Sequence, residues 1–113
     1  MEKYGAKEIM QYIIKDYEEV TMDLGYTAEQ AVYRILEEYV RVIRNWEFQK
    51  ATIYFSLVLL TYQSGEVPRF IYEQVIHLIS QENVEIYIKD IDKDEINDFL
   101  NIVYKVKKII SKI

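Results

Sequence analysis

The sequence predicts an all-α fold, a compact bundle of about five to six helices around a central apolar helix at about residues 46–64. Apolar residues recur every three or four positions along most of the chain, which is typical of amphipathic helices. The 3 Gly and 1 Pro fall between these periodic segments and are too few for the turns of a many-stranded β fold. A length of 113 residues suits a single domain, residues 1–113, with one core.

The first helix is predicted from about residue 6 to residue 24, and Gly25 closes it as a left-handed residue. A second helix begins at Thr27, where the Thr27–Gln30 spacing predicts a capping box. The apolar stripe of the first helix consists of Ile9, Ile13, Tyr17, Val20 and Leu24, and that of the second includes Ala31, Val32, Ile35 and Tyr39.

The third helix, from about residue 46 to 64, is apolar on nearly every side, which predicts a place in the middle of the bundle. Asn45 is its expected cap, and Gly65 ends it. The segment 68–80 is predicted to form a fourth helix.

A short fifth helix is expected at residues 83–90, although the apolar alternation of residues 84–89 also suits a strand. The last helix is expected to begin at Asp92 with a second capping box that includes Glu95. Its apolar stripe comprises Ile96, Phe99, Leu100, Val103, Val106 and Ile110.

Composition excludes several kinds of site. The absence of Cys excludes a disulfide framework, a thiolate zinc site and a cysteine nucleophile, and the 1 His excludes a site that needs two imidazoles. We expect no cofactor, since the glycines form no phosphate-binding loop. The 19 acidic residues against 14 basic ones give a net charge of −5, which argues against nucleic-acid binding.

The sequence points to the cytoplasm. Its start shows no signal-peptide pattern, and the most apolar stretch, residues 51–60, is shorter than the roughly 20 residues that span a bilayer. We therefore expect a cytoplasmic protein that does not contact the membrane.

Glu73 and His77 lie four residues apart and share one helical face, as an acid–base pair or half a metal site would require. Because the chain has no second His to complete a ligand set, we expect His77 to be partly buried with an intrahelical partner, and we expect no enzyme. A DNA-binding helix-turn-helix is rejected, because the helix that would read the groove is the most apolar one.

Acidic residues concentrate in the first two helices, where eight between Glu8 and Glu38 face only Lys15 and Arg34. Asp16, Glu19 and Asp23 form one stripe. This surface is either a solvated helix face or a docking surface for a basic partner. A second acidic cluster, residues 82–98, partly serves the start of the last helix.

The 11 tyrosines divide into two sets. Tyrosine is enriched at protein interfaces, because its stiff ring contributes area and its hydroxyl forms hydrogen bonds. Core or core-edge positions are expected for Tyr17, Tyr39, Tyr54 and Tyr62, whereas Tyr4, Tyr12, Tyr26, Tyr33, Tyr72, Tyr87 and Tyr104 fall near or outside the apolar stripes. The candidate partner-binding residues are Asp16, Glu19, Asp23, Glu37, Glu38, Tyr12, Tyr26 and Tyr33.

Two blocks carry a family resemblance: residues 25–32 (GYTAEQAV) with 35–39 (ILEEY), and residues 55–65 (FSLVLLTYQSG) with the apolar pairs of 75–79. They resemble the third immunity-protein family of bacterial polymorphic toxin systems. The resemblance implies a small, helical, cytoplasmic protein that binds and neutralises a cognate secreted toxin domain without being an enzyme.

One alternative stays open: a small acidic helical regulatory adaptor, or a phage-encoded inhibitor of a host protein. A homodimer is also considered, through leftover apolar positions of the last helix at Ile102, Ile109 and Ile113.

Overall fold

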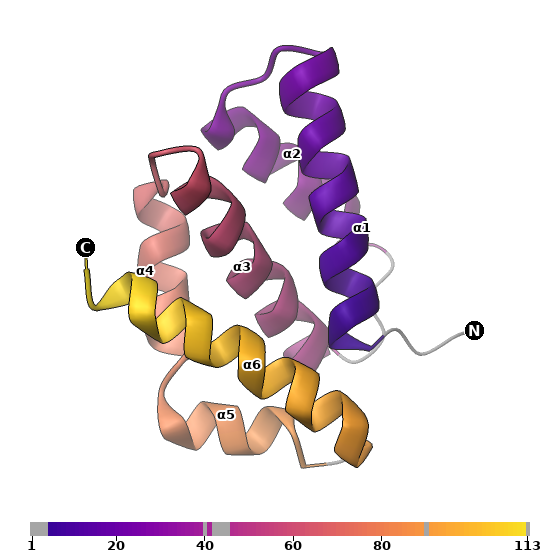
Figure 1. Cartoon of the computed structure of the whole chain (residues 1–113), viewed down its shortest axis with the longest axis vertical. Helices are drawn as coiled ribbons and strands as arrows, with labels where there is room; N and C mark the ends of the chain where they lie inside the picture. Colours follow the sequence, from indigo (N-terminus) through magenta and orange to yellow (C-terminus); the bar gives the residue numbers. More distant parts are fainter. Residues whose placement is uncertain (1–4, 40, 42–45, 90, 113) are drawn as a thin grey trace.

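Six α-helices and one π-helical segment form the described part of the chain, residues 5–39, 41, 46–89 and 91–112 of the computed structural model (Figure 1). No strand occurs among these residues, so the predicted all-α fold is confirmed. The elements are α1 (Ala6–Glu18), the π-helical segment η1 (Glu19–Asp23), α2 (Ala28–Tyr39), α3 (Trp46–Gln63), α4 (Arg69–Leu78), α5 (Gln81–Tyr87) and α6 (Lys93–Ile110).

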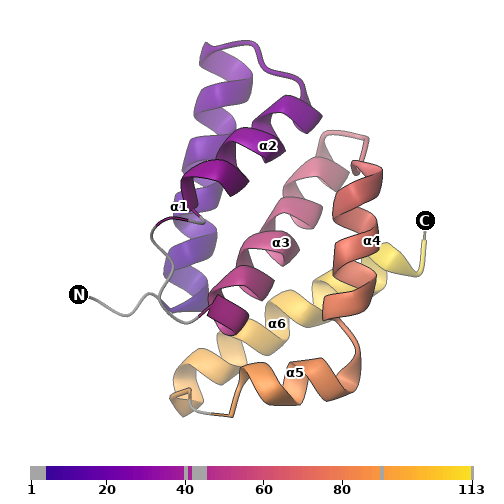
Figure 2. The same ribbon diagram turned by 180° about the vertical axis from the view of Figure 1, so that it is seen from behind.

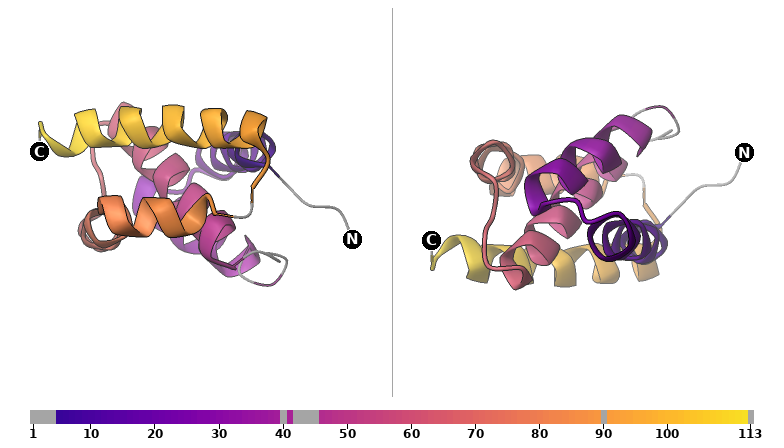
Figure 3. Two further views of the ribbon diagram at one scale, coloured as in Figure 1. Left: turned by 90° about the horizontal axis from the view of Figure 1, so that it is seen from below. Right: turned by 90° about the horizontal axis from the view of Figure 1, so that it is seen from above.

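Helix α3 occupies the centre, as its apolar character predicts. It packs against α1, α2, α4, α5 and α6 (Figure 1). Figure 2 shows α1 and α2 as a hairpin on one side of α3 and α4 on the other. In the left view of Figure 3, α6 runs along one broad face of the molecule, and α5 lies further from that face.

The polar side chains of α3 are buried without losing their hydrogen bonds. Thr52 and Ser56 donate to the carbonyl oxygens of Phe48 and Thr52 over 2.9 and 2.8 Å, and Thr61 donates to that of Leu57 over 2.7 Å. Each bond returns to the preceding turn of the same helix, so a small hydroxyl is satisfied inside the core. A helix that packs against neighbours on all sides can therefore bury a few hydroxyl groups.

The predicted end of α3 and the predicted start of α2 are confirmed. Gly65 has φ +97°, and the Glu66 and Gly65 amides donate to the carbonyls of Thr61 and Tyr62, which is a Schellman motif. At α2 the Gln30 amide donates to the Thr27 hydroxyl over 3.2 Å, and the Thr27 amide donates to the Gln30 side chain over 3.0 Å. Local sequence alone specifies both helix ends.

The second predicted capping box, at the start of α6, is not formed. Asp92 occupies the N-cap position but its side chain makes no capping hydrogen bond. The Glu95 carboxylate lies against Gly5 at the start of α1, where a Cβ on Gly5 would stand 2.8 Å from Glu95 Oε1. Glu95 thus lies at the positive end of a neighbouring helix rather than returning to its own.

Four predictions about side-chain burial on α3, α5 and α6 are wrong. Tyr62 is 39% exposed at the last turn of α3, and Leu100 is 38% exposed on α6. Tyr87 is buried, because α5 is a helix and places Tyr87 one turn after Val84, both against the core. Ile102 is also buried, which removes it from the surface proposed for a homodimer.

The strand alternative for residues 84–89 is wrong as well, since Ile86 faces outward on α5. Three positions named above, Tyr4, Asn45 and Ile113, lie outside the described residues. Among the described residues, no helix combines the length and the apolar character that crossing a membrane requires.

Candidate functional site

Two adjoining hollows lie along the α1–α2 hairpin and are rich in carboxylates. The first, a groove of about 80 Å³ between the two helices, is lined by Asp16, Glu19, Val20, Leu24, Arg34, Ile35 and Glu38. The second, a shallower hollow of about 340 Å³ on α1 and η1, is lined by Lys15, Glu18, Glu19, Met22 and Asp23. Glu19 borders both, so we treat these residues together as the acidic hairpin surface.

Arg34 is one of the residues that line the groove, and its positive charge offsets part of the negative charge there. Its Nε lies 3.5 Å from Glu38 Oε1, an exposed ion pair one helical turn apart. Its Nη1 donates to the Tyr26 hydroxyl over 3.1 Å, and its guanidinium carbon lies 5.7 Å from the centre of the Tyr26 ring. Arg34 therefore holds Glu38 and Tyr26 together at the rim of the groove.

Asp16 is held by Tyr39. The Tyr39 hydroxyl donates to Asp16 Oδ2 over 2.7 Å, which joins the end of α2 to the middle of α1. Burial raises the pKa of Tyr39 well above its usual range, and the hydrogen bond to Asp16 and the charge of that carboxylate raise it further. Tyr39 thus stays a hydrogen-bond donor, and Asp16 keeps a fixed position in the groove.

Two apolar side chains project from the acidic hairpin surface. Met22 is 79% exposed and Leu24 is 54% exposed. Leu24 is predicted on the buried stripe of the first helix, and the reason for the difference is η1. In a π-helix each hydrogen bond spans five residues, so each residue advances less around the axis than in an α-helix and the stripe loses its phase.

The structure places five of the eight candidate residues on the acidic hairpin surface or at its rim. Asp16, Glu19, Asp23, Glu38 and Tyr26 belong to the acidic hairpin surface or its rim. Tyr12 lies one turn before Asp16 on α1 and is half exposed. Tyr33 and Glu37 share a different face of α2.

Tyr33 is directed toward α4. Its ring stacks on that of Phe70 with the centroids 4.5 Å apart and an angle of 15° between the planes. The residues that sequence reasoning missed are Met22 and Leu24, whose exposure depends on η1, and Arg34, whose i,i+4 spacing from Glu38 is a visible signal.

The predicted pairing of Glu73 with His77 is not formed. Glu73 accepts from Arg69 Nε over 3.1 Å, one turn earlier on α4, and His77 is exposed rather than partly buried. Within the described ranges no three His, Asp or Glu side chains lie close enough to hold a metal ion.

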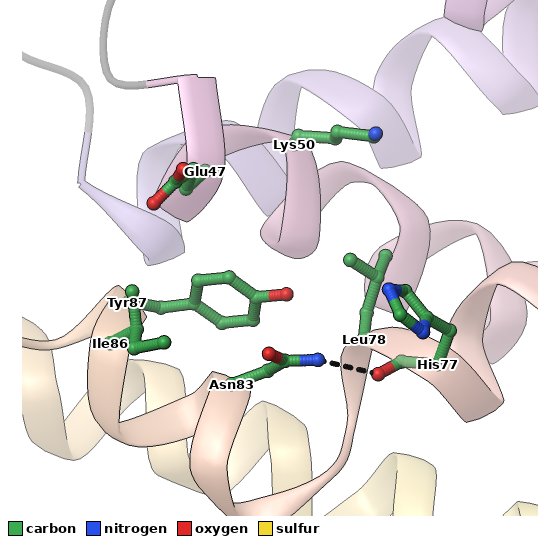
Figure 4. A pocket seen from close by; sticks show the side chains of 7 residues that line it. All are labelled: Glu47, Lys50, His77, Leu78, Asn83, Ile86 and Tyr87. Carbon is green, nitrogen blue, oxygen red and sulfur yellow. Dashed lines mark hydrogen bonds between the residues drawn. The ribbon is translucent and has the colours of Figure 1, made fainter.

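A third hollow, which sequence reasoning did not predict, lies where α3, α4 and α5 meet. It has a volume of about 230 Å³ and is lined by Glu47, Lys50, His77, Leu78, Asn83, Ile86 and Tyr87 (Figure 4).

Comparison of the chain with protein-family models, with curated proteins and with solved structures found no match.

Proposed function

We propose that this protein is a non-enzymatic bacterial immunity protein that acts in the cytoplasm, where it binds and neutralises a cognate toxin domain. The observation that carries the proposal is the acidic hairpin surface, on which five carboxylates accompany two cations and exposed Met22 and Leu24. The resemblance of residues 25–39 and 55–79 to an immunity-protein family supports the same function.

Charge and apolar contact have separate roles in this proposal. The carboxylates attract a basic surface, such as the cationic cleft of a toxin that acts on nucleic acid, and they accelerate association. Met22 and Leu24 supply the water-excluding contacts that slow dissociation, and methionine adapts well to the shape of a partner. The same surface therefore favours both fast and lasting inhibition.

The first test is growth rescue. The full chain is co-expressed with the C-terminal toxin domain of a secreted protein encoded immediately upstream of its gene, and the pair is recovered by pull-down. Restored growth and a recovered complex are expected. Growth arrest with no complex, or a gene neighbourhood without such a toxin, would favour the regulatory adaptor or the phage-encoded inhibitor instead.

The second test locates the surface. We expect Glu19→Lys with Asp23→Lys to slow association with the toxin domain by about tenfold or more at low ionic strength. The difference shrinks toward about 1 M salt, where the screening length is about 3 Å. Stopped-flow or surface-based kinetics measure both. Glu38 is left unchanged, because its reversal would also break the ion pair with Arg34.

The matched control is Glu82→Lys with Glu85→Lys, which makes the same change in net charge at exposed positions of α5, at the opposite end of the molecule from the turn that joins η1 to α2 (Figure 1). Equal slowing in both double variants would assign the effect to net charge rather than to the acidic hairpin surface. Unchanged association in the Glu19/Asp23 variant would rule out this surface as the docking site.

A further inference from the structure

The exposed side of the last turns of α6 is basic, in contrast to the chain as a whole. Residues 100–112 contain four lysines and no acidic residue. All four lysines are exposed, and in the part of the chain that the structure describes none of them forms an ion pair. The C-terminus of a helix favours cations in its last turn, which accounts for Lys107 and Lys108 but not for Lys105, which precedes that turn.

Two exposed apolar side chains accompany these lysines. Tyr104 is 59% exposed and Leu100 is 38% exposed. Lys108 follows Tyr104 at the same four-residue spacing, and its Nζ lies 4.5 Å from the centre of the Tyr104 ring, which holds the ammonium over the aromatic face. The basic stripe of α6 comprises Leu100, Tyr104, Lys105, Lys107, Lys108 and Lys112.

The acidic hairpin surface has the complementary composition. It carries five carboxylates against two cations, and its exposed apolar side chains are Met22 and Leu24. No cation of the described chain forms an ion pair with Glu18, Glu19 or Asp23. Each surface thus combines charges of one sign with two apolar side chains, and the two signs are opposite. Contact between them would satisfy both the charges and the apolar groups.

The two surfaces do not meet within one molecule. In Figure 1 the last turns of α6 lie beside the mark of the C-terminus, whereas the turn that joins η1 to α2 lies at the top of the molecule. Both α1 and α6 pack against the central helix α3, which fixes their separation. An acidic hairpin surface that covers the basic stripe therefore has to belong to another molecule.

We propose that the basic stripe of α6 binds the acidic hairpin surface of a second copy of this chain. The carboxylates of α1 and η1 face the lysines of α6, and the exposed apolar side chains of the two surfaces pack together. Because two different surfaces meet, the contact is heterologous, and every pair of molecules retains one free surface of each kind. Association therefore continues beyond the dimer as the protein concentration rises.

Nucleic acids and anionic membranes also attract lysines, but the charge of the whole molecule favours a second copy. A polyanion presents a dense negative surface to a chain with a net charge of −5. Two copies of the chain also repel each other, but that repulsion is spread over the molecule and is screened beyond about 8 Å at 0.15 M ionic strength. Opposite charges in direct contact lie within this distance and still attract.

Self-association also bears on the function proposed above. A second copy on the acidic hairpin surface covers the residues that are proposed to bind a toxin domain, so the two partners exclude each other. This consequence rests on the proposed function. The self-association itself does not, and it is measured without a toxin, so that failure of either proposal leaves the other standing.

The test is sedimentation velocity of the full chain from about 10 µM to about 0.5 mM, around the dissociation constant of about 0.1 mM that a small, polar interface suggests. At about 0.15 M salt the average mass should rise with concentration and pass that of a dimer. In about 1 M salt, where the screening length is about 3 Å, association should weaken about tenfold or more. A monomer at every concentration, or a mass that stops at the dimer, would overturn the proposal.

Two charge reversals identify the surfaces. Lys105→Glu with Lys107→Glu changes the basic stripe and keeps the contact of Lys108 with Tyr104, and Glu19→Lys with Asp23→Lys changes the hairpin. Each double variant alone should associate about tenfold more weakly than the wild type. An equimolar mixture should form a heterodimer with wild-type affinity, because one variant retains the hairpin surface and the other retains the stripe. If both variants give the wild-type circular dichroism spectrum but their mixture does not associate, the proposal is wrong.

The matched control for the stripe is Lys89→Glu with Lys93→Glu. It makes the same change in net charge at exposed positions, and Lys93 lies about three turns before Lys105 on α6. This variant should associate like the wild type, and an equal loss would assign the effect to net charge and overturn the proposal. A wild type that stays monomeric but binds vesicles of anionic lipid or single-stranded RNA through Lys105 and Lys107 would show that the stripe serves a polyanion instead.

Discussion

At the scale of single residues, Tyr39 contributes both to the stability of the fold and to the arrangement of the candidate surface. Its half-buried ring packs against the core while its hydroxyl holds Asp16 at 2.7 Å in the acidic groove. A carboxylate held in this way keeps its position without a partner protein, so the bond contributes to the fold and prepares the surface at once.

Tyr39→Phe should lower the free energy of unfolding by about 1.5–3 kcal/mol at neutral pH, because a hydrogen bond to the charged Asp16 carboxylate is lost. The free energy of unfolding of this variant should also decrease less than that of the wild type as the pH rises into the alkaline range. In the wild type the pKa of Tyr39 is raised in the folded state, so above about pH 10 the unfolded chain loses a proton that the folded protein retains, and rising pH favours unfolding. Urea denaturation at pH 7 and at a series of pH values above 9 measures both effects.

Tyr104→Phe serves as the control for this variant, because its side chain is 59% exposed on α6. It should change stability by less than about 0.5 kcal/mol and leave the alkaline slope as it is. If Tyr39→Phe and Tyr104→Phe have the same alkaline slope, the raised pKa of Tyr39 is not what makes the fold sensitive to alkali.

At the scale of elements, the start of α2 depends on two reciprocal hydrogen bonds between Thr27 and Gln30. Thr27→Ala should cost about 0.5–2 kcal/mol of stability, and Thr27→Ser much less, since Ser keeps the hydroxyl. A double-mutant cycle with Gln30→Ala measures the coupling between the two bonds. Additive effects of the two alanine substitutions would mean that the capping box does not act as a unit.

Helix ends that are fixed by residues close in the sequence could be predicted, and those that are fixed by tertiary contacts could not. Gly25 and Gly65 adopt positive φ, at +71° and +97°, where glycine is favoured for a local steric reason. By contrast, the missing cap of α6 follows from the contact of Glu95 with the start of α1. No local pattern carries that information, because the two segments are far apart in the sequence.

The burial of α5 shows the same limit. Apolar alternation and helical spacing both fit residues 84–88, and each predicts a different buried set. The helix buries Val84 and Tyr87 and leaves Ile86 51% exposed. Which set is buried depends on the position of Phe99 in α6, against which Tyr87 packs, and this position is a property of the tertiary fold.

At the scale of the whole molecule, the core gathers around α3 and a cluster of rings. Phe99 of α6 lies 5.0 Å from Phe48 and 5.9 Å from Phe55 between ring centroids, and both of these residues belong to α3. Tyr87 completes the cluster from α5. Three helices thus meet at one aromatic cluster.

Phe99→Ala should therefore destabilise the protein by about 3–5 kcal/mol, the cost of a large cavity in a packed core. Leu100→Ala, at the adjacent and 38% exposed position, should cost less than about 1 kcal/mol. Chemical denaturation monitored by circular dichroism measures both. Similar losses in the two variants would mean that α6 does not pack through the face that carries Phe99.

The acidic hairpin surface could be predicted only in part. The stripe of Asp16, Glu19 and Asp23 lies on one continuous helical stretch, so its spacing is visible in the sequence. The choice between Glu37 and Glu38 is not visible, because it depends on which face of α2 meets α1. Glu38 lies beside the groove, whereas Glu37 shares the face of α2 that carries Tyr33, whose ring stacks on Phe70.

The π-helical segment η1 has a consequence for how the length of the chain can change. A π turn accommodates one residue more than an α turn, so the loss of one residue between Glu19 and Asp23 would restore an α-helix and leave α1 undisturbed. The side chains after that point would keep their direction, because the shorter α turn covers about the same rotation as the π turn that it replaces. A single-residue deletion at η1 would thus remove one side chain from the acidic hairpin surface while the residues on either side, and the core beneath them, stay in place.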